Sequence, residues 1–81
     1  MRAMSHEDGA SELGGRIRER RQRQGLALKA TAKQAGISLQ YLSEIERGLK
    51  LPTLETLTKV AGALNTTVVK LLQNIDMFDH R

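Results

Sequence analysis

Residues 38–47 carry polar side chains whose chemistry suits hydrogen bonding to another molecule. They supply an amide, a hydroxyl, a carboxylate and a guanidinium, from Gln40, Ser43, Glu44 and Arg47. If the stretch is helical, at about 100° per residue, these side chains gather on one side. An amide pairs with adenine, a carboxylate accepts from cytosine N4, and a guanidinium pairs with guanine or phosphate. An ordinary solvated helix face shows a similar selection, so the pattern alone leaves both interpretations open.

The opposite side of the same stretch is apolar apart from one carboxylate. Tyr41, Leu42 and Ile45 gather there, and Glu46 lies among them. A half-buried carboxylate needs a cation close by. Arg21 is the expected partner, because it continues an apolar i, i+4, i+8 stripe earlier in the chain. We therefore expect Arg21 and Glu46 to form a structural ion pair rather than to contact a ligand.

Other kinds of site chemistry find little support in the sequence. The chain has no cysteine, and its two histidines, His6 and His80, lie isolated near the ends, so no metal site is expected. Ser43 has no histidine that would activate it as a nucleophile. A chain of 81 residues forms one small domain and rarely encloses a catalytic pocket. We expect no enzyme activity and no cofactor.

The positive charge is concentrated in the middle of the chain. Residues 16–50 carry nine basic and three acidic side chains, a net +6, whereas residues 1–15 sum to −2 and residues 51–81 to zero. A positive field confined to one segment favours a polyanionic partner. Short Arg-rich runs also occur on solvated helices, so the charge alone does not decide the question.

The rest of the sequence predicts an all-α domain that would position these side chains. Apolar residues make up 40% of the chain and aromatic residues 2%, so the core must consist of Leu, Ile, Val and Ala. Periodicity and capping residues predict five helices: Ser11 to a stop at Gly25, 28–35, 38–47 capped by Ser38, one capped by Thr53, and one capped by Thr67 that carries Val68 to Ile75. Residues 1–10 are predicted to be disordered.

The second and third predicted helices are short, and a turn that contains Gly36 joins them. Such a pair is the arrangement of a helix-turn-helix, whose second helix enters the major groove in proteins that bind DNA. Many helical bundles contain a similar pair. The specificity of the prediction therefore depends on the polar face of residues 38–47.

A longer series of residues agrees with a known family. The strongest block is Ala35-Gly36-Ile37-Ser38 followed by Tyr41-Leu42-Ser43-Glu44-Ile45-Glu46-Arg47-Gly48. It is preceded by Leu13 to Gly15, Arg16-Ile17-Arg18-Glu19, Arg21 and Gly25-Leu26, and followed by Pro52-Thr53-Leu54-Glu55-Thr56-Leu57 and Ala61-Gly62-Ala63-Leu64. From Leu13 to Leu72 the chain resembles the Xre/Cro/C1-type helix-turn-helix DNA-binding domains of phage repressors and bacterial regulators.

The resemblance implies a compact five-helix, lambda-repressor-like domain whose third helix enters the major groove of double-stranded DNA. It implies base contacts by Leu39, Gln40, Ser43 and Glu44. It implies contacts to the DNA backbone by Arg16, Leu28, Lys29, Ser38, Tyr41, Arg47, Lys50 and Thr53. Arg21 and Glu46 match the internal ion pair of the family, in agreement with the pattern described above.

The chain departs from the family pattern at a few positions. Ala27 stands where members usually have a Ser or Thr cap, and Leu28 replaces a glutamine that many members use to contact phosphate. Thr31 takes a position usually given to leucine. Leu39 cannot hydrogen-bond to a base, so it would meet a thymine methyl group or pack at the interface.

The C-terminal residues carry more apolar side chains than one helix face of a small monomer buries. Part of them would fill the core. The remainder, Val69, Ile75, Met77 and Phe78, would form a dimer interface, because one recognition helix alone binds DNA weakly and members of this family usually pair. The expected organisation is a disordered segment 1–10, a helix-turn-helix domain 11–75, and a tail 76–81.

The leading hypothesis is a homodimeric, sequence-specific transcriptional regulator, a repressor that reads an inverted-repeat operator through Ser38 to Arg47. A cytoplasmic location without membrane contact is expected, because residues 1–10 lack an apolar stretch for a signal peptide or membrane span. The alternative is an antitoxin or protein-interaction module whose DNA binding depends on a protein partner. A restriction–modification controller is a further variant.

Overall fold

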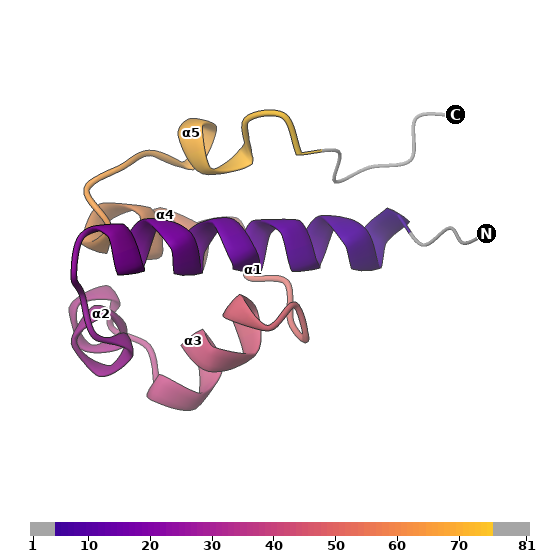
Figure 1. The fold of residues 1–81 in the computed structure, drawn as a ribbon. Helices are drawn as coiled ribbons and strands as arrows, with labels where there is room; N and C mark the ends of the chain where they lie inside the picture. Colours follow the sequence, from indigo (N-terminus) through magenta and orange to yellow (C-terminus); the bar gives the residue numbers. More distant parts are fainter. Residues whose placement is uncertain (1–4, 76–81) are drawn as a thin grey trace.

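The structure, a computed structural model, describes residues 5–75 and contains five helices in that range (Figure 1). They are α1 (Ser5–Arg23), α2 (Leu28–Ala35), α3 (Leu39–Glu46), α4 (Leu54–Ala63) and α5 (Val68–Leu72). The long α1 contacts α3 and α5, while α2 packs against α3 and α4. No strand occurs between residues 5 and 75, and the predicted all-α fold is confirmed.

The first helix begins at Ser5, six residues before the predicted start at Ser11. Ser11 is therefore an exposed residue inside α1 and not its N-cap, and α1 extends into the segment 1–10 for which the sequence predicts disorder. Gly9 lies buried within the helix. A glycine inside a helix lowers its stability by about 1 kcal/mol relative to alanine, which favours a helix start after Gly9. Extending a helix that has already formed needs no new nucleation, so α1 continues through Gly9 to Ser5. Residues 1–4 lie outside the described range.

The predicted N-caps of the later helices are confirmed. The hydroxyl oxygens of Ser38, Thr53 and Thr67 accept hydrogen bonds from the backbone N–H groups of Tyr41 (3.0 Å), Thr56 (3.1 Å) and Lys70 (3.2 Å). These bonds satisfy amides that have no partner within the helix. The α2 helix differs, because Ala27 has the extended backbone of a cap (φ −72°, ψ 150°) but no side chain that accepts such a bond.

The fifth helix is shorter than predicted. It ends at Leu72, so Ile75 is not part of it, contrary to the expectation that the helix carries Val68 to Ile75. The backbone turns at Asn74, which has a positive φ of 64°. Asn tolerates this left-handed conformation better than most residues, and the turn ends the helical path. Ile75 instead packs, half-buried, against the edge of the core.

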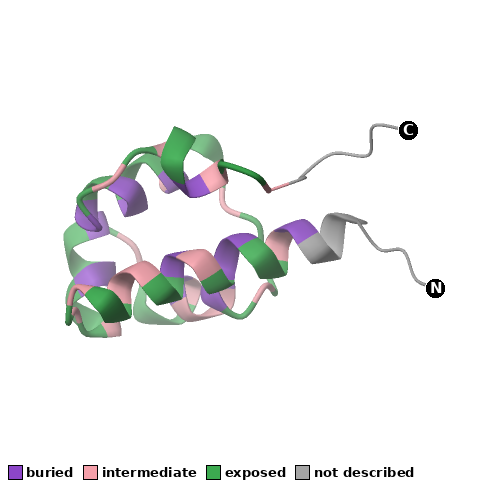
Figure 2. Ribbon diagram, turned by 45° about the horizontal axis from the view of Figure 1, so that its top comes forward, coloured by how far each residue is buried: buried purple, intermediate pink, exposed green. Residues whose placement is uncertain are grey.

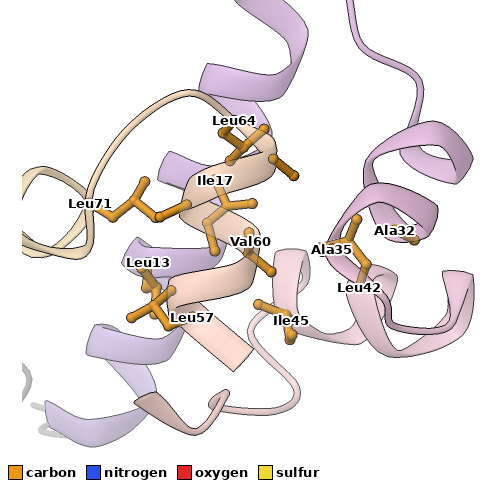
Figure 3. Packing of buried hydrophobic residues seen from close by; sticks show 12 residues of the cluster. Leu13, Ile17, Ala32, Ala35, Leu42, Ile45, Leu57, Val60, Leu64 and Leu71 are labelled. Atoms are coloured by element: carbon orange, nitrogen blue, oxygen red, sulfur yellow. The ribbon is translucent and has the colours of Figure 1, made fainter. Parts of the chain in front are cut away.

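The core is built from aliphatic side chains contributed by all five helices (Figure 3). Its members are Leu13, Ile17, Ala32, Ala35, Leu42, Ile45, Leu57, Val60, Ala61, Ala63, Leu64 and Leu71. Each helix turns its buried residues inward and leaves its outer side to solvent (Figure 2). Burying one large aliphatic side chain contributes roughly 1.5–3 kcal/mol, so this cluster is the main source of stability.

Two glycines permit α1 to approach the end of α3 closely. A methyl group added at Gly14 would lie 2.3 Å from the carbonyl oxygen of Ile45 and 2.6 Å from that of Glu46. One added at Gly48 would lie 2.6 Å from the hydroxyl of Ser11, and Gly48 also has a positive φ of 77°. Side chains at these positions would therefore push α3 away from α1.

Polar side chains in the last turn of α1 and directly after it hold the turn between α4 and α5. Arg20 donates to the carbonyl oxygens of Leu64 (3.0 Å) and Asn65 (2.9 Å), and Gln24 also donates to Leu64 (2.7 Å). The amide of Asn65 returns a hydrogen bond of 3.2 Å to Gln24. Because carbonyls at the end of a helix lack partners within it, these bonds fix the end of α4 against α1.

Candidate nucleic-acid interface

The turn between α2 and α3 fixes the direction in which α3 leaves the bundle. Gly36 adopts a φ of 74° and donates to carbonyl oxygens of the last turn of α2. The next amide, that of Ile37, donates to Ala32 at 3.0 Å, and the Ile37 side chain packs against the core. A left-handed glycine followed by an apolar anchor is a typical helix C-terminus. The predicted helix-turn-helix is therefore present over residues 28–46.

The third helix has the two faces that the sequence predicts. Leu42, Ile45 and Glu46 are buried against the rest of the bundle. On the other side, Leu39, Gln40 and Arg47 are exposed, and Ser43 and Glu44 are half-buried. Leu39 leaves 47% of its surface exposed, so it presents an apolar contact at the start of the helix.

The predicted ion pair between Arg21 and Glu46 is confirmed. The guanidinium donates from Nε to one carboxylate oxygen at 2.7 Å and from Nη2 to the other at 3.0 Å. Its Nη1 donates to the carbonyl oxygen of Leu26 at 2.8 Å. The hydrogen bond with Glu46 raises the pKa of Arg21 above its ordinary value. This pair joins α1 to the end of α3.

The polar side chains on the outer face of α3 are linked to one another. Arg47 Nε donates to the hydroxyl of Ser43 at 3.3 Å. Gln40 Nε2 donates to one oxygen of Glu44 at 3.4 Å, and the ammonium of Lys50 lies 3.3 Å from the other oxygen. These contacts limit the rotamers available to the face before any ligand is bound.

Most of the expected backbone-contact residues lie on or beside the α2–α3 unit. Lys29 is exposed in the first turn of α2, next to the uncapped Ala27. Ser38 and Thr53 are exposed N-caps, and their hydroxyl oxygens already serve their own helices. Leu28 and Tyr41 are half-buried and pack on the core, so only part of each is accessible.

Arg16 does not join this group. Its Nη1 donates to the carbonyl oxygens of Leu71 (3.4 Å) and Gln73, and its Nη2 lies 3.8 Å from Glu12. The guanidinium thus closes the C-terminal end of α5 against α1, which satisfies carbonyls that lack helical partners. In this structure the Arg16 guanidinium thus lies at the contact between α1 and α5, and its expected contact with the DNA backbone stays a prediction.

The expected dimer residues divide into three cases. Val69 leaves 74% of its surface exposed on α5, as an interface residue of an isolated chain would. Ile75 packs against the core, so its contact with a partner would be partial. Met77 and Phe78 lie outside the described residues.

Sequence reasoning missed three features of this region. Leu49, Leu51 and Leu54 are exposed large apolar residues between α3 and the first turn of α4. The close approach at Gly14 and the link between Glu44 and Lys50 were also not anticipated. For the exposed leucines, the only signal in the sequence is that Leu49 and Leu51 stand two residues apart in a linker without a helical or alternating pattern.

Within the described residues no group of three or more His, Cys, Asp or Glu side chains gathers as metal ligands would. Among the helices of residues 5–75, none combines the length and the apolar character needed to cross a bilayer.

Five helices with a helix-turn-helix at α2–α3 define the lambda-repressor-like fold. A model of the helix-turn-helix family matches residues 17–71, and the chain belongs to this family, of the Xre/Cro/C1 kind. The transcriptional regulator DdrOP3 of Deinococcus deserti is 46% identical over 67 residues, which are 83% of this chain and 52% of that protein. This chain thus spans about half the length of that curated relative. It spans 59% and 55% of the SinR regulators of Bacillus licheniformis and Bacillus subtilis.

Solved structures agree with the fold. The restriction-modification controller protein C.AhdI from Aeromonas hydrophila is 31% identical with a TM-score of 0.75, covering 76% of this chain and 94% of that one. The biofilm regulator SinR in complex with DNA is 39% identical with a TM-score of 0.71, covering 75% and 98%. A complex of SinR with the SinI protein is also similar, at 38% identity and a TM-score of 0.72, covering 76% and 61%.

Proposed function

We propose that this chain is the DNA-reading domain of a transcriptional regulator and that α3 enters the major groove. The observation that carries the proposal is the outer face of α3, where Gln40, Ser43, Glu44 and Arg47 lie together on a helix fixed by the Arg21–Glu46 pair. Base readout needs donors and acceptors on a rigid element, and this face supplies both. Family membership and the SinR–DNA complex support the same function.

Phosphate contacts would surround this helix. One phosphate would bind at the uncapped start of α2. There it would accept hydrogen bonds from free backbone amides, including that of Leu28, and contact the ammonium group of Lys29. Arg47, Lys50 and the cap residues Ser38 and Thr53 suit others, together with the hydroxyl of Tyr41. Leu39 would contact a thymine methyl group. A DNA-reading role implies that the protein works in the compartment that holds the DNA.

The regulator would act as a homodimer on an inverted repeat, most simply as a repressor that blocks a promoter. Two copies related by a two-fold axis place their recognition helices about one helical turn, or 34 Å, apart. The exposed Val69 on α5 supports an interface in that region. In the relative DdrOP3 the matched segment is only 52% of the protein.

A second candidate is a regulator whose DNA binding depends on a protein partner, as in an antitoxin. The complex of the similar SinR with SinI favours keeping this candidate. A restriction–modification controller is a variant of the first candidate, supported by the likeness to C.AhdI. Purification of the tagged chain under mild conditions distinguishes them, because a partner-dependent protein would carry a stoichiometric second chain.

Selection of bound duplexes from a random pool tests the proposal. Near 150 mM salt, nonspecific binding is weakened because it depends on released counterions, so sequence preference dominates the recovered pool. The proposal predicts an enriched inverted repeat with half-sites one turn apart. Recovery of an unchanged pool by folded protein would refute sequence reading by this chain alone.

A further inference from the structure

The carboxylate of Glu44 lies on the outer face of α3 with both oxygens occupied by donors of the same chain. The Lys50 ammonium is 3.3 Å from Oε1, and the Gln40 amide nitrogen is 3.4 Å from Oε2. The Glu44 side chain is only 19% exposed, whereas that of Lys50 is 58% exposed. Glu46, the other acidic residue of α3, is occupied by Arg21 inside the fold. Glu44 is therefore the one negative charge that α3 would bring toward DNA.

A carboxylate is selective among base edges because it only accepts hydrogen bonds at neutral pH. In the major groove the donors are the amino groups of cytosine and adenine, while guanine and thymine present acceptors to it. Opposite an acceptor, Glu44 would lose water without gaining a hydrogen bond, which is unfavourable for a charged group. Phosphates on both sides of the groove add repulsion of like charge.

This selectivity of Glu44 also depends on whether the Lys50 ammonium stays paired with its carboxylate. A phosphate beside the linker would compete with Glu44 for the Lys50 ammonium, because both are anions at hydrogen-bonding distance. If Lys50 turns to the phosphate, Glu44 loses its cation unless a base amino group replaces it. On a sequence without that amino group, Lys50 therefore remains engaged by Glu44.

We propose that Glu44 is a specificity-determining residue that weakens binding to wrong sequences, by holding Lys50 away from phosphate until a cytosine or adenine amino group engages its carboxylate. This inference rests on the proposed insertion of α3 into the major groove, and it assigns the discrimination to one carboxylate. Its consequence is unusual for a contact residue: removing the charge strengthens binding to unrelated DNA.

Four proteins test the inference: the unchanged chain, Glu44→Gln, Lys50→Ala and the double variant. Glu44→Gln keeps the shape of the side chain and removes its charge. Glu12→Gln is the matched control, because Glu12 is also paired with a basic residue, Arg16 at 3.8 Å, on the α1–α5 side of the fold. Dissociation constants are measured on the selected duplex, its single-base variants and an unrelated duplex at several salt concentrations. Circular dichroism and thermal unfolding confirm that each variant is folded.

The expected result is that Glu44→Gln binds the unrelated duplex roughly tenfold more tightly, the scale of one polar contact. The release of Lys50 to a phosphate makes the slope of log K against log salt steeper by about 0.9. Preference for one base pair of the selected duplex is relaxed. Glu12→Gln changes binding to both duplexes much less, because its charge lies off the α3 face.

The double variant separates charge removal from the release of Lys50. Lys50→Ala should flatten the salt slope on unrelated DNA by about 0.9 in the Glu44→Gln background and by clearly less in the unchanged background. Equal effects in the two backgrounds overturn the coupling. If Glu44→Gln binds unrelated DNA no more tightly than Glu12→Gln does, the proposed role of Glu44 in discrimination is wrong.

Failure of the inference is distinguishable from failure of the proposed function. If the unchanged chain prefers its selected duplex while Glu44→Gln gains nothing on unrelated DNA, α3 reads DNA but the assignment to Glu44 is wrong. If the unchanged chain binds no duplex at low salt, the proposed function fails and the inference falls with it.

Discussion

Arg21 and Glu46, 25 residues apart in sequence, meet in two hydrogen bonds of 2.7 and 3.0 Å between α1 and the last turn of α3. The pair fixes the rotation of α3 about its axis, because it holds Glu46 on the buried side of the helix while Gln40 stays exposed. A third hydrogen bond of 2.8 Å, from Arg21 to the carbonyl oxygen of Leu26, anchors the guanidinium to the turn after α1. The pair thus connects the fold to the side chains proposed to read DNA.

Loss of Glu46 is expected to destabilise the fold strongly. Glu46→Ala leaves the Arg21 guanidinium without its partner in a site where only 11% of its side chain is exposed. Removing one member of such a pair costs about 3–5 kcal/mol of unfolding free energy. Urea unfolding followed by circular dichroism measures the loss. The double variant Arg21→Met with Glu46→Leu should recover most of it, and a single variant as stable as the unchanged protein would contradict the structural role.

Gly14→Ala is expected to destabilise the contact between α1 and α3. The added methyl group would lie 2.3 Å from the Ile45 carbonyl oxygen, and backbone atoms there must shift. The expected loss is about 2 kcal/mol, within the usual range for overpacking. Gly15→Ala is a matched control, since nothing lies within 4 Å of its added methyl group. That control should raise stability by about 0.5–1 kcal/mol through helix propensity, and opposite signs for the neighbouring positions are the result to look for in thermal unfolding.

Ala27→Ser is expected to stabilise the protein by adding the missing cap of α2. Ala27 already has a suitable backbone, with φ −72° and ψ 150°, close to that of the working cap Ser38 at φ −72° and ψ 154°. A serine cap contributes about 1 kcal/mol, and Ser38→Ala should lose a similar amount. If the free amides of α2 also hold a phosphate, Ala27→Ser should weaken DNA binding while it raises the unfolding midpoint. A gain in stability without any change in DNA affinity would argue against that phosphate contact.

Substitution of Val69 tests the proposed dimer. Val69 is 74% exposed on α5 and is not needed for the core, so Val69→Asp should leave the unfolding midpoint within about 0.5 kcal/mol of the original. A charge buried at a dimer interface without a partner should abolish pairing. Sedimentation equilibrium measures the mass, with Lys70→Asp as the control on the neighbouring exposed position. A dimer that persists in Val69→Asp would place the interface elsewhere.

Local chemistry explains why much of this fold follows from the sequence. The end of α2 is set by Gly36, which adopts a positive φ, and the start of α3 by a serine hydroxyl that reaches the amide of Tyr41. Both signals act within a few residues. The partnership of Arg21 with Glu46 also follows, because a carboxylate on an apolar helix face requires a cation, and one lies on the apolar face of the first helix.

The features that escaped prediction depend on contacts between distant segments. Arg16 binds the end of α5 because that helix stops at Leu72, and no local signal indicates where the carbonyls of Leu71 and Gln73 will lie. The link from Glu44 to Lys50 depends on the turn at Gly48, which brings the linker back toward α3. The early start of α1 at Ser5 was missed because Gly9 is a poor helix former on its own.

The central claim is that the outer face of α3 reads base edges, and Gln40→Ala tests it most directly. Gln40 is exposed and does not contact the core, so the variant should fold normally. Its affinity should be measured on the selected duplex, on every single-base variant of that duplex and on unrelated DNA, at one fixed salt concentration. The account predicts a loss of about 1–3 kcal/mol on the selected duplex, relaxed preference at one base pair and little change on unrelated DNA. Equal losses on selected and unrelated DNA would contradict it.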